Sequence, residues 1–347
     1  MYLKKIIVAV ALLGVLIGGV IVFNIYTSIF SPNTAFNNET AYVYIPTSAS
    51  FNDVKQQLTP LLNNLDSFES VAKRKGYTTN VKAGKYAIKR GMNNNDIINS
   101  LRSQNLPIKV SFNNQETIDK LAGRIADQIE ADSLSLLKAF NDESFLNSNN
   151  FNSDTKLSFY IPNSYEFFWN TSPNEFRDRM LKEYNRFWND DRLQKAKNIN
   201  LTKEEVIALA SIVQKETAKV DERPRVAGVY LNRLKKNMLL QADPTVIYAI
   251  KKHTGNYDTI IKRVLYRDLE FDSPYNTYIY AGLPPGPITM PDITSIDAVL
   301  NAEAHDYYYF AANVKDFGYH KFAKTLSQHN QNAREYQTWM NSQNINR

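Results

Sequence analysis

Glu216 lies near the end of a predicted helix, on the side that carries apolar residues. Over residues 202–218 (TKEEVIALASIVQKETA), a rotation of about 100° per residue places Glu216 angularly between Leu209 and Ile212. A carboxyl group on an apolar face is costly unless it is paired, protonated or directed into a cleft, so its pKa is raised. A raised pKa suits a general acid near neutral pH, which makes Glu216 the candidate catalytic residue.

A structural ion pair is the alternative explanation for Glu216. Arg223 and Arg225 follow it closely in the chain, and either of them can pair with its carboxylate. Ion pairs without a catalytic role also shift pKa values. Helical periodicity alone therefore leaves both explanations open.

Two further polar residues follow a second predicted helix at residues 223–234. Asp243 precedes Pro244, and an N-cap followed by proline at the first helical position explains both residues structurally. We therefore rank Asp243 first as a cap and second as a binding residue. Gln241 has no such explanation, and its amide can hydrogen-bond a sugar hydroxyl or an acetamido group.

The segment 272–287 (DSPYNTYIYAGLPPGP) combines prolines, glycines and polar aromatic residues without periodicity. This composition predicts a shaped loop, and binding residues are concentrated on such loops. Four of its residues are expected to bind a polar ligand, with tyrosine faces stacking on sugar rings: Ser273, Tyr275, Asn276 and Thr277. The alternative is an Ω-loop that its prolines hold in shape without any ligand.

Other kinds of chemistry are excluded or unsupported by the residue types. The chain has no cysteine, which rules out disulfides, thiolate metal sites, iron–sulfur clusters and a cysteine nucleophile. The four histidines lack metal-ligand spacing and no nucleotide-binding or serine-hydrolase motif is present, so we expect no metal and no cofactor. The net charge of +6 suits anionic surfaces, but the lack of a basic-aromatic repeat argues against nucleic acid.

The N-terminus predicts a membrane anchor. Residues 6–23 (IIVAVALLGVLIGGVIVF) form an unbroken apolar run of 18 residues, roughly 27 Å of helix, close to the hydrocarbon thickness of a bilayer. Lys4 and Lys5 in the 1–5 tail precede the run, so the positive-inside rule places the N-terminus in the cytoplasm and the remainder in an extracytoplasmic (periplasmic) location. A cleaved signal peptide is the alternative, but the run is long for one and no clear cleavage site follows.

The exported part is predicted to be α+β, with two folded regions after a polar linker at residues 24–40. Residues 41–106 alternate strand and helix patterns and form a small βα module, in which Asn94 or Asn95 can cap the last helix. Residues 107–347 form a larger, mixed α/β region with a core at 200–347. Within that core, a T-x-x-E capping box that begins at Thr202 marks the start of the helix that carries Glu216.

Five motifs in one order resemble the endolytic murein transglycosylases, the MltG or YceG-like family. They are LASIVQKET (209–217), ER-x-x-x-AGV-x-x-NRL (222–234), LQADPTVIY (240–248), SPYNTY (273–278) and GLPPGPI (282–288), and the tail motif TLSQHN (325–330) agrees with them. The resemblance is weaker over the rest of the exported part, where residues 83–101 resemble the LysM-like module of that family.

The resemblance implies an activity. Members of this family cleave the β-1,4 bond between N-acetylmuramic acid (MurNAc) and N-acetylglucosamine (GlcNAc) inside nascent peptidoglycan strands without water, which leaves 1,6-anhydro-MurNAc ends. Their catalytic glutamate corresponds to Glu216, and a single carboxyl group can act first as acid and then as base. The expected partners are peptidoglycan glycan strands, the cytoplasmic membrane and cell-wall synthases.

The chain departs from the family pattern at a few positions, and two other functions stay open. The departures are Asn114–Gln115, Leu157, Ser158, Asn163 and Met290–Pro291, and those in the first half remove alternative acids. One other function is a non-catalytic, membrane-anchored glycan-binding scaffold, which would bind the wall regardless of Glu216. The other is a muramidase-type hydrolase, which needs a second carboxylate, and Asp243 is the candidate for it.

Overall fold

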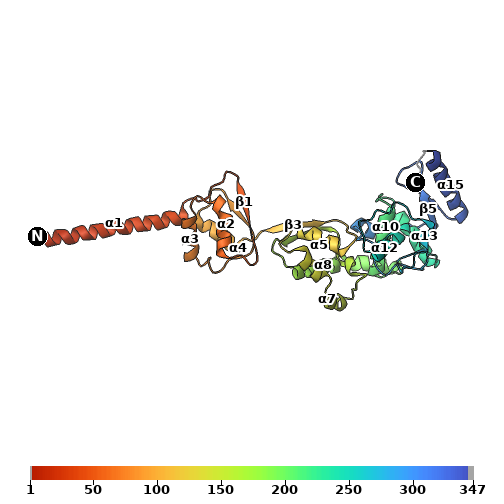
Figure 1. Ribbon diagram of the computed structural model, residues 1–347, viewed down its shortest axis with the longest axis horizontal. Coiled ribbons are helices and arrows are strands. Elements are labelled where there is room, and N and C mark those ends of the chain that lie inside the picture. Colours follow the sequence, from red (N-terminus) through yellow and green to blue (C-terminus); the bar gives the residue numbers. More distant parts are fainter. Residues whose placement is uncertain (1, 343–347) are drawn as a thin grey trace. The chain divides into compact units, whose positions relative to one another are not determined.

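The structure is a computed structural model that describes residues 2–342. The chain divides into two compact units, one containing the chain up to Val110 with Gln128–Ala131 and Tyr165–Ser172, and the other containing the remaining residues. Helices dominate both units in Figure 1, and the named strands form three two-stranded sheets. The predicted mixture of helices and strands behind an N-terminal apolar helix is confirmed. Three short stretches beyond residue 106, including residues 107–110, group with the first unit, so the units and the predicted regions differ in extent.

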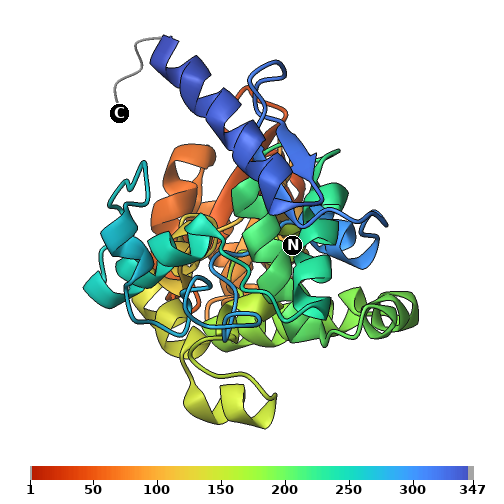
Figure 2. The ribbon, with the colours of Figure 1, turned by 90° about the vertical axis from the view of Figure 1, so that its right-hand side faces the viewer.

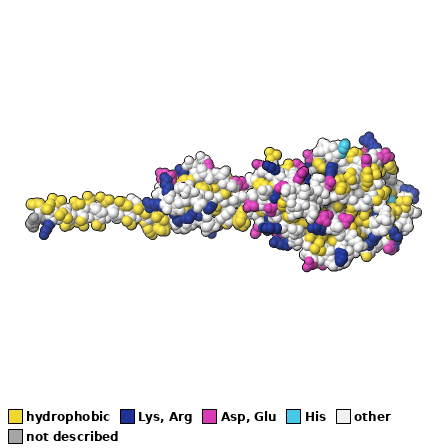
Figure 3. All heavy atoms as spheres, turned by 90° about the horizontal axis from the view of Figure 1, so that it is seen from below, with side chains coloured by type: hydrophobic (Ala, Val, Ile, Leu, Met, Phe, Trp, Pro, Cys, Tyr) yellow, Lys and Arg dark blue, Asp and Glu magenta, His cyan; other side chains and the backbone are white. Residues whose placement is uncertain are grey.

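The first helix, α1 (Tyr2–Phe30), is apolar on all sides. Its mean hydropathy reaches 3.1 over an 18-residue window, and none of that window is buried. Among residues 2–342 it is the one helix long and apolar enough to cross a membrane. At about 1.5 Å per residue it is about 44 Å long, which exceeds the hydrocarbon thickness of a bilayer. Figure 3 shows hydrophobic side chains along its whole length, with basic side chains at its N-terminal end.

The predicted linker at residues 24–40 is shorter than expected, because α1 continues to Phe30. The segment after it is bonded to the small unit. Asn33 is buried, and its Nδ2 donates to Oδ1 of Asn94 at 2.7 Å and to the carbonyl of Asn64 at 2.9 Å. Sequence patterns did not reveal these contacts, because they join asparagines that are distant in the chain.

The small unit contains a two-stranded antiparallel sheet with helices around one core. In chain order its elements are β1 (Thr40–Ile45), α2 (Phe51–Leu58), the 3-10 helix η1 (Thr59–Leu61), α3 (Leu65–Arg74), β2 (Gly84–Lys89) and α4 (Asn94–Ser103). Strand β1 pairs with β2, from Thr40 opposite Lys89 to Ile45 opposite Gly84. The N-cap of α4 is Asn93, whose side chain accepts from the amide of Asp96, so the expected caps Asn94 and Asn95 were wrong. The LysM-like character of this unit stays a prediction.

The remaining elements belong mainly to the larger unit. They are β3 (Pro107–Phe112), α5 (Ile118–Ala126), α6 (Ser133–Phe140), α7 (Glu143–Ser148), η2 (Lys156–Phe159), β4 (Asn163–Phe168), α8 (Pro173–Phe187), α9 (Asp190–Asn198), α10 (Lys203–Glu216), α11 (Arg223–Lys235), α12 (Asp243–Thr254), α13 (Tyr266–Leu269), α14 (Ile293–Leu300), β5 (Tyr309–Ala312), β6 (His320–Ala323) and α15 (Leu326–Ser342). Strand β3 pairs with β4, and β5 pairs antiparallel with β6. Helix α15 contacts both β5 and β6, as Figure 2 shows.

Helix α10 forms the centre of the larger unit. It packs against α11, α12 and α14, and all eight residues from Val206 to Val213 are buried. The predicted capping box is confirmed, because the Thr202 hydroxyl accepts from the amide of Glu205 while the Glu205 carboxylate accepts from the amide of Thr202. The expectation of a single apolar face was wrong, since neighbouring helices surround α10. Glu216, its last residue, is half-buried where this packing ends.

Candidate active site

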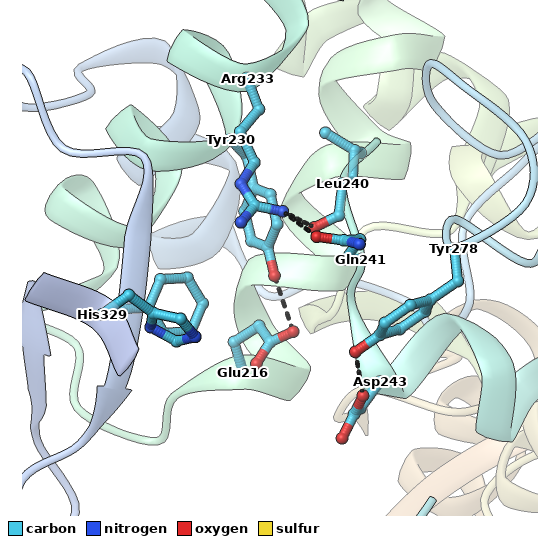
Figure 4. A pocket seen from close by; sticks show the side chains of 9 residues that line it. Glu216, Tyr230, Arg233, Leu240, Gln241, Asp243, Tyr278 and His329 are labelled. Carbon is cyan, nitrogen blue, oxygen red and sulfur yellow. Dashed lines mark hydrogen bonds between the residues drawn. The ribbon is translucent and has the colours of Figure 1, made fainter. Parts of the chain in front are cut away.

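A cavity of about 360 Å³ opens at the C-terminal end of α10. Figure 4 shows two carboxylates that line it, Glu216 from the end of α10 and Asp243 from the start of α12. The remaining lining comes from α11, from the loops before α12 and after α13, from β5 and from α15. The full set is Glu216, Tyr230, Arg233, Leu240, Gln241, Asp243, Tyr278, Phe310 and His329.

Glu216 is held by one short hydrogen bond and has a raised pKa. The hydroxyl of Tyr230 donates to Oε1 of Glu216 at 2.7 Å (Figure 4). Burial is the largest influence and raises the pKa of Glu216 to about 7, with a further increase from the negative charge of Asp243. The Tyr230 hydrogen bond and the charges of His320 and Arg233 act in the opposite direction. The carboxyl group is therefore divided between its acid and base forms near neutral pH.

The ion-pair explanation of Glu216 is wrong. Arg223 donates instead to both oxygens of Asp292, at 2.9 and 2.8 Å. Arg225 pairs with Glu303 at 2.9 Å. Both arginines are thus engaged elsewhere, and Glu216 is left with a neutral hydrogen-bond partner.

Tyr230 is a site residue that sequence reasoning missed. It lies on α11, is only 2% exposed, and its ring packs edge-on against Phe310. Burial is also the main reason why its own pKa lies far above the usual range, so its hydroxyl stays protonated and acts as a donor. Its position three residues before Arg233 is the only sequence signal, because residues with that spacing share one helix face.

Arg233 is buried in the wall of the cavity and binds the backbone segments that form it. It is 7% exposed, and it donates to the carbonyls of Tyr308 at 2.6 Å, Leu239 at 3.0 Å and Leu240 at 2.9 Å. Its Nη1 also lies 3.3 Å from Oε1 of Gln241 (Figure 4). This contact directs the carbonyl end of the Gln241 amide towards the arginine and leaves the NH₂ end for another partner.

Gln241 combines exposure to the cavity with an unusual backbone. Its φ of 51° lies in the left-handed region, which is uncommon for residues other than glycine and occurs often at functional sites. Its amide N–H donates to the carbonyl of Thr277 at 3.0 Å. The structure thus brings Gln241 to the same cavity as Glu216, in agreement with its selection from the sequence, while a role in ligand binding stays a prediction.

The assignment of Asp243 as an N-cap was wrong. The N-cap of α12 is Ala242, which makes no side-chain cap, and Asp243 is already the first helical residue. Its Oδ1 instead accepts a hydrogen bond from the hydroxyl of Tyr278 at 2.6 Å (Figure 4). Helix boundaries predicted from local sequence are uncertain by a residue or more. Because α12 begins at Asp243 and not after it, the Asp243 carboxylate does not cap the helix and lines the cavity.

The four residues chosen from the 272–287 loop do not line this cavity. The Ser273 hydroxyl accepts from the amide of Tyr275 within the loop. Tyr275 is 1% exposed, and its hydroxyl donates to Asp154 at 3.1 Å. Ser273 and Tyr275 therefore belong to another part of the surface, where they line a separate cavity with Asp154.

The other two loop residues are fully buried and hold the loop together. Asn276 donates through its side chain to two backbone carbonyls of the preceding segment, those of Leu269 and Phe271. The Thr277 hydroxyl accepts from the amide of Ala242 at 3.0 Å. Tyr278, the last residue of the same SPYNTY motif, is the one that reaches the Glu216 cavity, and our reading of the sequence missed it.

His329 contributes an uncharged ring to the cavity wall. It stacks on Tyr309 with ring centroids 5.3 Å apart, and burial lowers its pKa. Its Nδ1 is buried and has no hydrogen-bond partner within residues 2–342. No group of three or more histidine, aspartate or glutamate side chains suited to a metal ion occurs among the described residues.

Two of the residues that depart from the family pattern, Gln115 and Met290, are in contact in the structure. The amide of Met290 donates to the carbonyl of Gln115 at 2.9 Å, and the carbonyl of Met290 accepts from the Gln214 side chain of α10. Leu157 is buried in η2, whereas Asn163 is exposed. None of these residues lines the Glu216 cavity.

We expect Glu216→Gln to stabilise the protein at alkaline pH. The pKa of Glu216 is about 7 in the fold against an ordinary value of 4.5, so the folded state binds this proton more tightly than the unfolded state does. Stability of the wild type therefore falls as pH rises from about 4.5 to about 7. Because Glu216 is only half-buried and lines an open cavity, solvent screening reduces the effect, and we expect the loss to be about 2 kcal/mol.

The measurement is the Tm of the full chain in detergent micelles at about pH 5 and about pH 8. Glu216→Gln should exceed the wild type by a few degrees at the higher pH and not at the lower one. Glu166→Gln, at an exposed position of β4, is the matched control and should give no such difference. A Tm difference between Glu216→Gln and the wild type that does not change with pH would contradict the raised pKa.

Comparison with known proteins places this chain in the YceG-like family. Residues 43–335 match the model of the YceG-like family. A protein of Bacillus subtilis (strain 168) named endolytic murein transglycosylase is 31% identical over 340 residues, which cover 92% of this chain and 91% of that protein. A protein of the same name from Streptococcus pneumoniae (serotype 2, strain D39) is 29% identical over 301 residues, which cover 78% of this chain and only 53% of that longer protein.

A solved structure agrees with these matches. The crystal structure of a yceG-like protein, lmo1499 from Listeria monocytogenes, is similar with a TM-score of 0.56 and 30% sequence identity. The similarity covers 85% of this chain and 99% of the Listeria chain. The likeness therefore extends over nearly all of that protein.

Proposed function

Because this chain belongs to the YceG-like family, we propose that it is a membrane-anchored murein transglycosylase that cuts peptidoglycan glycan strands internally. The observation that carries the proposal is Glu216 itself. Its carboxyl group has a pKa of about 7, is held by Tyr230, and lines a cavity wide enough for part of a sugar chain. A group with that pKa can both donate and accept a proton at neutral pH.

In the first step, protonated Glu216 acts as general acid. Tyr230 donates its hydrogen bond to Oε1, so the acidic proton resides on the other oxygen, Oε2. That oxygen gives its proton to the glycosidic oxygen while the bond from this oxygen to C1 of MurNAc breaks. The bonding electrons leave with the GlcNAc hydroxyl, and positive charge develops at C1.

In the second step, the resulting Glu216 carboxylate acts as general base. It accepts the proton of the MurNAc C6 hydroxyl while that oxygen forms a bond to C1. The glutamate ends in its original protonated form, no water is consumed, and the new end is 1,6-anhydro-MurNAc. One residue thus serves both steps. A pKa near neutral pH favours this double role, because both protonation states of the carboxyl group are then populated.

Substrate positioning falls to the polar residues around the glutamate. Arg233 holds the carbonyl oxygen of the Gln241 amide, so its NH₂ group can donate to the carbonyl of an acetamido group. Tyr278 lies beside Asp243 and offers its ring to the face of a sugar. Both kinds of contact suit a neutral, hydroxyl-rich and acetamido-bearing ligand.

A hydrolase is the second candidate, because Asp243 lies in the same cavity as Glu216. In that mechanism Asp243 would activate a water or stabilise the sugar cation while Glu216 acted as the acid. The Tyr278 hydroxyl already donates to Oδ1 of Asp243 at 2.6 Å, so this oxygen is engaged by the protein and is less available to a water or a sugar cation. We therefore favour the intramolecular attack of the C6 hydroxyl.

The apolar helix α1 supports a location at a membrane. We propose that this helix anchors the protein in the cytoplasmic membrane, with Lys4 and Lys5 on the cytoplasmic side and the two units outside. Such an anchor keeps the enzyme close to newly made strands. Association with cell-wall synthases is a prediction that no contact in the structure tests.

The product decides among these functions. We expect the full chain in detergent micelles to release glycans from purified peptidoglycan whose ends are one water lighter than hydrolysis products, as mass spectrometry would detect. Ordinary reducing ends would identify a hydrolase and direct attention to Asp243. Binding without any release would instead identify a glycan-binding scaffold.

A further inference from the structure

A second cavity, of about 380 Å³, shares its supporting elements with the Glu216 cavity. Lys215 lines it and directly precedes Glu216 in α10, while Pro244 lines it and directly follows Asp243 in α12. Consecutive Cα atoms are about 3.8 Å apart, so the same two helix ends form walls of both cavities. The second cavity therefore adjoins the site where we propose that the sugar chain is cut.

Charged groups of both signs face this second cavity. Glu116 accepts hydrogen bonds from Lys215 at 2.5 Å and from Lys251 at 3.2 Å. Burial opposes the charge of Glu116, but these two lysines outweigh it and lower the pKa of the carboxyl group, which stays ionised. Lys120 pairs with Asp258 at 2.7 Å on the rim. The lining thus offers anchors for carboxylates and for an ammonium group alike.

Most of the remaining lining residues are aliphatic or aromatic. Ile247, Tyr248 and Ile288 line it beside the lysines, and residues 257–261 of the loop after α12 complete it. The side chain of Ile260 in this loop is 82% exposed although it is large and hydrophobic. An apolar lining with paired charges of both signs suits a short peptide, whereas a sugar chain has no charged groups to match them.

We propose that this second cavity receives the peptide stem of a MurNAc residue beside the bond that is cut. The inference rests on the proposed function, since the stem is attached to the sugar that the Glu216 cavity would hold. Stem peptides carry carboxylates, a diamino acid and the methyl groups of alanine, which match the lysines, Glu116 and the isoleucines. At about 3.3 Å per extended residue, three residues of stem span roughly 10 Å, enough to enter a neighbouring cavity.

The test compares two substrates that differ only in the stems. Initial rates of anhydro-end release are measured for the full chain in detergent micelles, on glycan strands with their stems and on the same strands after an amidase has removed them. The wild type should cut the intact strands about tenfold faster, the factor expected for one good charge interaction. Lys251→Met should reduce this ratio to near one and leave the rate on bare strands unchanged.

Matched variants separate recognition from stability. Lys195→Met removes a lysine that pairs with Asp191 on the surface of α9, and it should keep the wild-type ratio. If Lys251→Met fails to fold, as its Tm would reveal, Ile261→Glu on the loop after α12 changes the same cavity at a half-buried position.

The outcomes distinguish this inference from the proposed function. A wild type that cuts both substrates equally, with Lys251→Met indistinguishable from it, overturns the stem-binding inference. Equal loss on both substrates in Lys251→Met also overturns it, because the cavity would then hold the sugar chain. No cleavage of either substrate by the wild type would refute the proposed function instead.

Discussion

Glu216→Gln is expected to abolish strand cleavage while the protein stays folded. The amide has no acidic proton to give to the glycosidic oxygen and no basic oxygen to take one from the C6 hydroxyl, so both steps fail. General acid–base catalysis contributes about 10²–10⁴-fold to rates, and we expect a loss of at least about 10³-fold because one residue serves twice. The carbonyl oxygen of glutamine can still accept the hydrogen bond from Tyr230.

The measurement is the initial rate of release of anhydro ends from purified peptidoglycan by the two full-length proteins. Glu166→Gln carries the same chemical change at an exposed residue of β4 and should keep the wild-type rate. Binding of the variant to insoluble peptidoglycan should be unchanged, which separates lost chemistry from lost affinity. More than a tenth of the wild-type rate in Glu216→Gln would mean that another group supplies the proton.

Arg233→Leu is expected to have the largest effect on stability. The guanidinium is nearly buried, and it is the donor to the carbonyls of Tyr308, Leu239 and Leu240. Leucine leaves these acceptors without that donor in a packed wall, at about 1–3 kcal/mol for each acceptor that water cannot reach. We expect a total loss of about 3–5 kcal/mol, together with loss of the orientation of Gln241.

The Tm of the full chain in detergent micelles measures this effect, and we expect a decrease of about 10 °C. Arg186→Leu is the matched control, because the Arg186 side chain is 74% exposed and pairs with Glu183 on the surface of α8. Arg233→Lys should recover part of the stability, since an ammonium group can donate to some of the same carbonyls. A Tm within two degrees or so of the wild type for Arg233→Leu would show that these carbonyls find other donors.

The effects of these two substitutions differ in kind, and the difference reflects how the site is built. We propose that Glu216 carries the chemistry, and we expect it to cost stability at alkaline pH because its charge is desolvated. Arg233 contributes to stability and shapes the wall in which Gln241 and Leu240 lie. The proposed acid–base group and the residue that shapes the wall around it are thus different residues, and the two substitutions test them separately.

Much of this protein was determined by short-range features of its sequence. The capping box at Thr202 set the start of α10, because it needs only residues three apart. The length and uniform apolarity of residues 6–23 predicted α1, since those properties need no partner. Family motifs in one order predicted the YceG-like family, which the comparisons confirm. Helical periodicity had already directed attention to Glu216, and the lack of a local structural explanation had directed it to Gln241.

Tertiary structure decided how the candidate site is assembled. Tyr230, fourteen residues beyond Glu216, is the hydrogen-bond partner of Glu216 in place of the expected arginines. Tyr278 donates a hydrogen bond to the Asp243 carboxylate, which local sequence rules had assigned to a helix cap. The middle of α10, from Val206 to Val213, is buried on all sides and not on one, because it packs against α11, α12 and α14. The physical reason is the same in each case. Caps and apolar runs depend on neighbours in the chain, whereas the pKa of a carboxyl group and its hydrogen-bond partner depend on which distant segments pack around it.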